Sequence, residues 1–261
     1  MANKQENNLF AFGDASDDLA NGRHQFIEFY HLPSDQSVSF KAFLTTFSDQ
    51  YQSEWNDEEA YGRMDPITTF KRTKRVISLG WDLPAAGIEE AAMNLERVSR
   101  LLSMLYPDYE DLDSGAAKIK TNPLFKLRFM NLIQNSASPG QSAKEGGLLG
   151  KVSGFTYEPD IEQGFYDPWD VVSEAPDVKF LNPKDFKGEL LFPQTIKLQC
   201  EFTVLHQHDL GWNTKNRRTG FDQFPYSAPN IQPGAQPPTA GAPNINVSNN
   251  KIKFKSGIHS A

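Results

Sequence analysis

The chain has 261 residues, of which 38% are hydrophobic and 12% aromatic, so it can bury a core and is not wholly disordered. Its formal net charge of −7 argues against a main role in gripping nucleic acid through the phosphates, because that role requires a basic surface. A single cysteine, Cys200, excludes an internal disulfide and a zinc site built on cysteines.

The chain begins with a polar, acidic arm over residues 1–22, which contains one apolar island at residues 9–12. We expect the arm to be loosely held and its island to dock on another surface. The first eight residues lack a signal-peptide core, and no run approaches the roughly 18 apolar residues of a membrane span. We therefore expect no membrane contact and folding in a cytoplasm.

The main predicted domain, residues 23–224, is rich in strands. Period-two alternation of apolar and polar residues predicts a strand at five places. These are residues 23–32, 38–44, 125–129, 148–159 and 195–205. The 19 phenylalanines favour the same interpretation, because Phe suits a pleated, half-buried surface. In the last strand Cys200 alternates with aliphatic residues, so we interpret it as inert packing.

Two adjoining segments predict a projecting hairpin. Residues 53–62 are acidic and turn-like. Residues 65–83 are either a strand pair or one long bent strand, since apolar residues recur there at period two. The basic residues 71–75 are expected to form the charged tip of the hairpin, beyond the core.

One amphipathic helix is predicted from about residue 85 to residue 106. Six apolar residues recur at steps of three and four and share one face. They are Ile88, Ala91, Leu95, Val98, Leu102 and Leu105. Pro84 is expected to open the helix and Pro107 to end it. Four polar residues are expected on the opposite face: Asn94, Glu96, Arg97 and Arg100.

The last part of the chain, residues 225–261, is dominated by Pro, Gly, Ala and Asn. It cannot bury enough apolar surface to fold alone, so we expect an extended tail. Residues 251–255 read Lys-Ile-Lys-Phe-Lys, an alternating segment suited to adding as a strand to a neighbour's sheet.

Two histidines follow the strand at residues 195–205. His206 and His208 point the same way at period two, as a metal pair requires, but Asp209 is the only local third ligand. We interpret them as solvent-facing residues at a strand end and predict no bound metal.

Five carboxylates cluster within residues 54–65: Glu54, Asp57, Glu58, Glu59 and Asp65. Paired carboxylates can hydrolyse sugars, yet a solvated acidic loop needs no special geometry, and we favour that interpretation. The chain also lacks a Gly-x-Ser-x-Gly elbow and a Walker loop, so we predict no enzyme activity and no cofactor.

The carboxylate segment also carries aromatic and basic residues that suit contact between subunits, as do the basic run after it and the tail. The candidate subunit-interface residues are Trp55, Tyr61, Arg63, Met64, Asp65, Arg72, Lys74, Arg75, Lys253 and Phe254.

Several strings of the sequence resemble baseplate tail-tube proteins of contractile-tailed bacteriophages. They are Trp55-Asn56, Tyr61-Gly62-Arg63-Met64-Asp65-Pro66-Ile67, Arg75-Val76-Ile77-Ser78-Leu79, residues 123–129, 154–160 and 196–208, and Gly211-Trp212. The resemblance implies a mainly β (α+β) fold: a tail-tube-like β-sandwich or partly closed barrel with one packed α-helix and extended termini.

The resemblance also implies a structural virion protein of a contractile injection system. Six copies would form a ring at the baseplate, join the central hub or spike to the first tail-tube ring, and initiate the tube. Other baseplate proteins, such as a sheath initiator, are possible neighbours, and DNA would be only passing cargo. The arm and tail exceed a plain tube subunit, which favours an adaptor.

Two other functions stay open from the sequence. One is a baseplate-associated cell-wall hydrolase that uses Glu54 and Glu58. The other is a monomeric β-sandwich module that binds sugar or protein, with Tyr166 and Trp169 in a groove.

Overall fold

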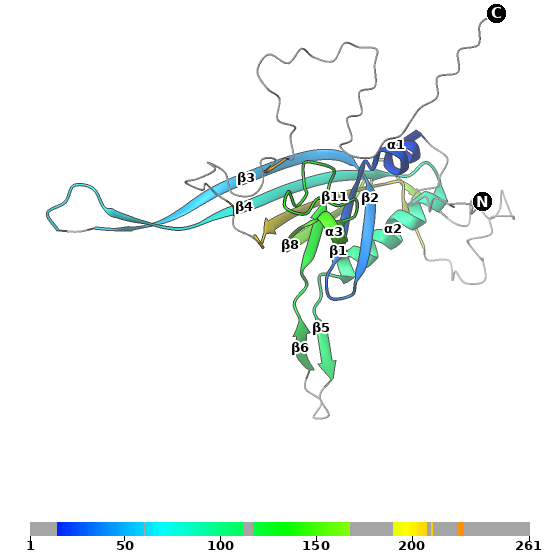
Figure 1. Cartoon of the computed structure of the whole chain (residues 1–261). Helices are drawn as coiled ribbons and strands as arrows, with labels where there is room; N and C mark the ends of the chain where they lie inside the picture. The colour runs from blue at the N-terminus through cyan, green and yellow to red at the C-terminus, as the bar shows by residue number, and fades with distance from the viewer. Residues whose placement is uncertain are drawn as a thin grey trace, which may run out of the picture. The chain divides into compact units, whose positions relative to one another are not determined.

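A computed structural model describes residues 15–59, 61–111, 117–167, 190–207, 210 and 224–226. The predicted fold class is confirmed: the chain is mainly β, with one large antiparallel sheet and few helices. The sheet has seven strands in the order β2-β1-β7-β8-β11-β4-β3 (Figure 1).

The strands of the main sheet differ greatly in length. They are β1 (Phe26–His31), β2 (Gln36–Lys41), β3 (Phe43–Glu58), β4 (Ile67–Pro84), β7 (Phe125–Arg128), β8 (Leu148–Pro159) and β11 (Thr195–Val204). Two small antiparallel pairs lie outside it: β5 (Asp108–Asp111) with β6 (Ala117–Thr121), and β9 (Phe165–Tyr166) with β10 (Phe192–Pro193). The helices are α1 (Ala15–Arg23), α2 (Ile88–Ser103) and α3 (Ala143–Gly146).

The two edges of the sheet meet at one corner. β2 and β3 stand at opposite ends of the strand order, yet only Ala42 separates them in the chain. Two residues on either side of Ala42 cannot be more than about 7 Å apart, because each Cα–Cα step is about 3.8 Å. The backbone N–H of Ala42 also donates to the carbonyl of Gln25 at 3.3 Å. The sheet therefore curls toward closure, and the single strand predicted over residues 38–44 is broken at this corner.

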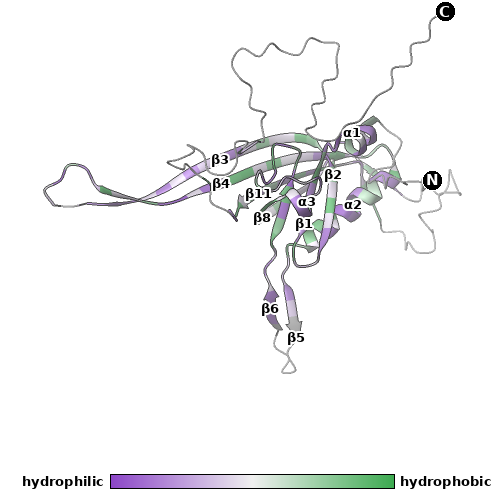
Figure 2. Ribbon diagram, in the orientation of Figure 1, coloured by the Kyte–Doolittle hydropathy of each residue, from purple (hydrophilic) through white to green (hydrophobic). Residues whose placement is uncertain are grey.

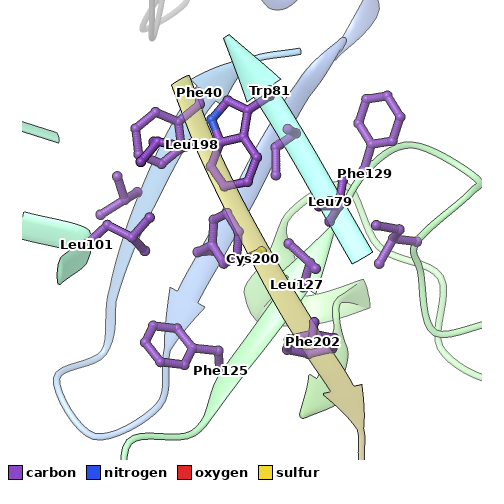
Figure 3. Close-up of a cluster of buried hydrophobic side chains, with 14 of the residues drawn as sticks. Phe40, Leu79, Trp81, Leu101, Phe125, Leu127, Phe129, Leu198, Cys200 and Phe202 are labelled. Carbon is purple, nitrogen blue, oxygen red and sulfur yellow. The ribbon is translucent and has the colours of Figure 1, made fainter. Parts of the chain in front are cut away.

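The core lies on the face that the sheet encloses. Along β11, Ile196, Leu198 and Phe202 are fully buried, whereas Lys197 and Gln199 are exposed. This alternation is the one that the sequence predicts, and Figure 3 shows the labelled members of the cluster converging from several strands and α2.

Aromatic rings fill the centre of the core. The ring of Trp81 lies 5.7 Å from that of Phe29, 5.8 Å from Phe40 and 6.4 Å from Phe155, measured between centroids. Phe29 and Phe155 meet edge to face at 5.4 Å. These distances suit tilted and T-shaped aromatic packing, which explains why so many phenylalanines occur in a sheet protein.

The predicted helix exists but is shorter than expected. It begins after Gly87, because Pro84 is the last residue of β4 and does not open the helix. Val98, Leu101 and Met104 join the core, while Asn94, expected on the polar face, is only 5% exposed. The prediction for Asn94 was wrong because the buried face is wider than the apolar stripe.

The N-terminal arm is more firmly attached than we expected. Its second half forms α1, which is tied to the body by buried charges: the Lys41 ammonium lies 2.8 Å from Asp17 and 2.8 Å from Glu90. Glu90 in turn accepts a hydrogen bond from the Ala86 N–H at 2.9 Å. Lys41 thus links β2 with α1 and α2, a contact that hydrophobic periodicity does not reveal. The apolar island at residues 9–12 lies outside the described residues.

The hairpin is longer than predicted and its tip is elsewhere. β3 continues through residues 53–58, which we expected to be a turn, and β4 is one strand from Ile67 onward. The connection between them is residues 59–66, so the basic residues 71–75 lie within β4 and not at the tip. Residues 53–58 show no strand period in the sequence because neither face of this part of β3 is buried. The β5–β6 pair was not predicted either.

The opposite exposures of Leu198 and Gln199 give a direct test of the fold. Replacing the fully buried Leu198 by Ala should lower the free energy of unfolding by about 3 kcal/mol, since a cavity forms in a packed core. Gln199→Ala, one residue away on the exposed face, should change it by less than about 0.5 kcal/mol. Urea denaturation followed by circular dichroism measures both, and equal effects would contradict the strand orientation.

Candidate subunit interface

The β3–β4 hairpin extends past the rest of the sheet. β4 pairs with β11 only from Val76 onward, so its earlier residues pair with β3 alone. At about 3.3 Å per residue, this free-standing part is roughly 30 Å long. We call residues 52–74 the distal hairpin; it can be followed in Figure 1.

Most of the predicted interface residues lie in the distal hairpin. Trp55 is on β3, Arg72 and Lys74 are on β4, and Tyr61, Arg63, Met64 and Asp65 are in the connection. Tyr61 and Met64 are fully exposed. The structure thus brings these residues together on one projecting element. Lys253 and Phe254 lie outside the described residues.

An aromatic pair stands on the distal hairpin with no core behind it. Trp55 and Phe70 are cross-strand partners whose rings meet edge to face at 5.2 Å, and they are 55% and 51% exposed. Hydrophilic residues otherwise prevail along this element (Figure 2). Phe70 was not among the predicted interface residues. Its importance follows from the register of the hairpin, because the cross-strand partner of Trp55 is Phe70. Large exposed apolar groups on a marginally stable ribbon are typical of a surface that a partner covers.

Arg75 has a different role from the one predicted. It is 1% exposed, and its Nη2 lies 2.7 Å from the Asp49 carboxylate, which also accepts from Nε at 3.0 Å. The Tyr51 ring lies 5.2 Å from its guanidinium carbon. The prediction that Arg75 contacts another subunit directly was therefore wrong, because Arg75 braces the base of the hairpin. We call the cluster of Asp49, Tyr51 and Arg75 the hairpin root.

A turn from the end of the domain covers the hairpin root. The Tyr226 hydroxyl donates to Asp49 at 3.1 Å, and the Phe224 ring packs edge to face on Tyr51 at 6.3 Å. Asn131 donates to the Tyr226 carbonyl at 3.1 Å. Burial raises the pKa of Tyr226, which keeps its hydroxyl a donor. This cluster fixes the base from which the distal hairpin extends.

Three carboxylates of the predicted acidic loop, Glu54, Asp57 and Glu58, lie on β3, and Glu59 and Asp65 lie in the connection to β4. Arg72 donates to Glu54 at 2.7 Å and 3.3 Å, and this hydrogen bond holds the pKa of Glu54 below its usual range. A general acid in sugar hydrolysis needs the opposite shift. The ion pair thus disfavours Glu54 as the general acid of a hydrolase.

The other sequence candidates are distributed over the domain. His206 is exposed at the end of β11, and His208 and Trp169 lie outside the described residues. Within the described ranges no group of three or more His, Cys, Asp or Glu residues could hold a metal. Tyr166 donates to the Ala85 carbonyl at 3.2 Å and packs near α2, so it supports the fold.

The sheet face opposite the core is polar and, in the described part of the chain, uncovered. It presents hydroxyl, amide and charged side chains from four neighbouring strands: Thr46, Ser78, Ser153, Thr156, Lys197, Gln199 and Glu201. A shallow hollow of about 440 Å³ lies on this face where β8 bulges against β11. A sheet with one face packed on the core and one face exposed to solvent is typical of antiparallel architecture.

Comparison with known proteins adds no identification: no protein-family model and no curated protein matches the chain. Among the described helices, none is both long enough and apolar enough to cross a membrane.

The hairpin root should be far more sensitive than the distal hairpin to loss of charge. Asp49→Asn leaves the buried Arg75 guanidinium uncompensated, which should lower the free energy of unfolding by about 3–5 kcal/mol. Glu54→Gln removes an exposed ion pair and should leave stability nearly unchanged. Thermal unfolding of both variants tests this; an insensitive Asp49 variant would contradict the bracing role.

Cys200 should be chemically silent in the folded chain. Burial raises the pKa of its thiol to about 12, so at pH 8 almost none is thiolate, the reactive form. Ellman's reagent should therefore react within minutes only after unfolding by guanidinium. Rapid labelling of the native chain would show that β11 is not packed as described.

Proposed function

We propose that this chain is a structural subunit of a phage contractile tail. In this proposal it forms a ring at the baseplate, joins the central hub or spike to the tail tube, and initiates tube assembly. The chain performs no chemistry and needs no cofactor. Its partners are copies of itself, the hub or spike protein and the first tube ring, with other baseplate proteins as neighbours and DNA as passing cargo.

The observation that carries the proposal is the long β3–β4 hairpin at the edge of a curling sheet. Among the described strands, β3 lies at the edge of the sheet along its whole length, and the distal hairpin continues that edge past the core. Exposed edge strands are places where another chain adds to the sheet. A closed ring satisfies every such edge with the same contact repeated, which is the arrangement of cyclic oligomers.

The polar sheet face supports the same proposal. In a ring the core face, with α2 against it, would point outward and the polar face would line the channel. Its hydroxyl and amide groups, together with a net charge of −7 for the chain, would let DNA pass without adhering. The sequence resemblance, carried by residues 55–79 and four later segments, contributes the phage context.

Neither alternative function gains support from the described residues. The hydrolase alternative uses Glu54 and Glu58, and the ion pair of Glu54 with Arg72 disfavours Glu54 as the general acid. The binding-module alternative places Tyr166 and Trp169 in a groove; the Tyr166 hydroxyl is bonded to the backbone at Ala85, and Trp169 lies outside the described residues.

Removing the distal hairpin should abolish assembly but not folding. Gln52 and Lys74 are cross-strand partners, so residues 53–73 can be replaced by Asn-Gly, which closes a two-residue hairpin turn. We expect an unchanged circular dichroism spectrum and a chain that no longer enters purified tails of the parent particle. A matched control carries Glu201→Lys on the polar face and should still enter them.

Electron cryo-microscopy of the same particles tests the location. The proposal expects a ring of this chain between hub and tube, with β3, β4 and β11 toward the channel. A chain absent from the tails, or one that degrades peptidoglycan as a monomer, would overturn the proposal.

A further inference from the structure

The outer edge of β3 has backbone groups unpaired by any described strand, to which a further strand could bind. Among the described residues, β3 pairs with β4 on one side and with no strand on the other. The first residues of β4, from Ile67 to Arg75, likewise have no partner on their far side within the described part of the chain. The distal hairpin thus offers two edges on which a further strand can add.

The two edges carry opposite charge. β3 bears Glu54, Asp57 and Glu58, and β4 bears Lys71, Arg72 and Lys74. Glu54 and Arg72 neutralise each other. The remaining four charges take part in no ion pair with any described residue, so an incoming basic strand is attracted by the β3 edge and repelled by the β4 edge.

The two faces of β3 also differ. Side chains alternate along a strand, so Glu54 and Glu58 point to one face, while Tyr51 and Trp55, together with Asp57, point to the other. A strand that matches this edge should place basic groups on the first face and apolar groups on the second.

One segment of the sequence has this pattern. Residues 251–255, Lys-Ile-Lys-Phe-Lys, lie outside the described residues, and as a strand they would show three lysines on one face and Ile252 with Phe254 on the other. We propose that residues 251–255 of a second copy of this chain add as a strand to the outer edge of β3. The inference rests on the proposed function, which supplies the second copy.

The length of the connecting chain fits a contact between copies. Tyr226 is anchored at the hairpin root, and 24 residues, 227–250, separate it from Lys251. Fully extended, a segment of that length reaches up to about 80 Å. Donation of a strand by each copy to the next is a head-to-tail contact, which closes a ring when the rotation permits.

A peptide-binding measurement tests the match between strand and edge. The receptor is the full chain with Ile252→Pro and Phe254→Pro, so that its own tail cannot add as a strand and compete, whatever the charge of the edge. The probe is a fluorescein-labelled peptide of residues 248–258, followed by anisotropy. We expect saturable binding that weakens about tenfold when Asn56→Lys and Glu58→Lys are added. At Glu58 an opposite-charge cross-strand pair becomes a like-charge pair, and at Asn56 a neutral position becomes repulsive.

Two controls make the result specific. Glu201→Lys in the receptor reverses a charge of the same kind on the distant polar face and should leave binding unchanged. A peptide with all three lysines changed to Glu should bind the Asn56→Lys, Glu58→Lys receptor better than the original receptor. Absence of saturable binding by the original peptide, or equal binding by all receptors, would overturn the inference.

A mixing experiment decides whether the strand comes from a second copy. One chain carries the proline-substituted tail and Gln52→Cys; the other carries Asn56→Lys, Glu58→Lys and Ser256→Cys, and the buried Cys200 does not interfere. We expect a disulfide-linked heterodimer on mixing. If instead Gln52→Cys and Ser256→Cys join only within one otherwise unchanged chain, the second-copy assignment is wrong. Rings in tails without this cross-link would overturn the inference and leave the proposed function standing, whereas the cross-link without rings would do the reverse.

Discussion

Every backbone N–H and C=O group of a sheet needs a hydrogen-bond partner, and at an edge strand half of them lack one within the sheet. The fold of this chain handles the two ends of its sheet differently. β2 is short and meets β3 at the Ala42 corner, with α1 close to it. β3 instead continues for 16 residues, and on one side no strand from the described part of the chain pairs with it. A long open edge favours aggregation unless a specific partner occupies it, and that need underlies the functional account.

The packed core holds the inner part of β3 in place. Trp81, Phe29 and Phe40 pack with α2 into one core that holds β4 and β11 in register, and Asp49 with Arg75 secures the last point at which β3 and β4 have support from the body. Beyond that point the distal hairpin has only its own cross-strand pairs. A firm root followed by a weakly held extension suits an element that becomes ordered by the neighbour it contacts.

The sequence predicted the elements whose two faces differ. β11 alternates cleanly between apolar and polar residues, and the bounds of β8 and β11 were predicted almost to the residue. The errors occurred where that contrast disappears. Residues 53–58 read as a turn because a strand with both faces in water has no apolar period, and α1 was missed because its anchor is one carboxylate, Asp17, on Lys41. The candidate interface residues were predicted from residue types alone. Arg75 was misplaced among them because a charge at a strand position gives no sign of a buried partner such as Asp49. Phe70 was missed because its significance depends on the register with Trp55.

Amide hydrogen exchange of β3 tests the account most directly. In the isolated full-length chain, the outward N–H groups of residues 52–58 should exchange within seconds, whereas the buried amides of β11 should stay protected for far longer. After assembly into tails, the account predicts that exchange along β3 slows strongly while exchange in β11 hardly changes. If the β3 amides exchange equally fast in the isolated chain and in the assembled particle, its edge is not a subunit contact and the central claim is wrong.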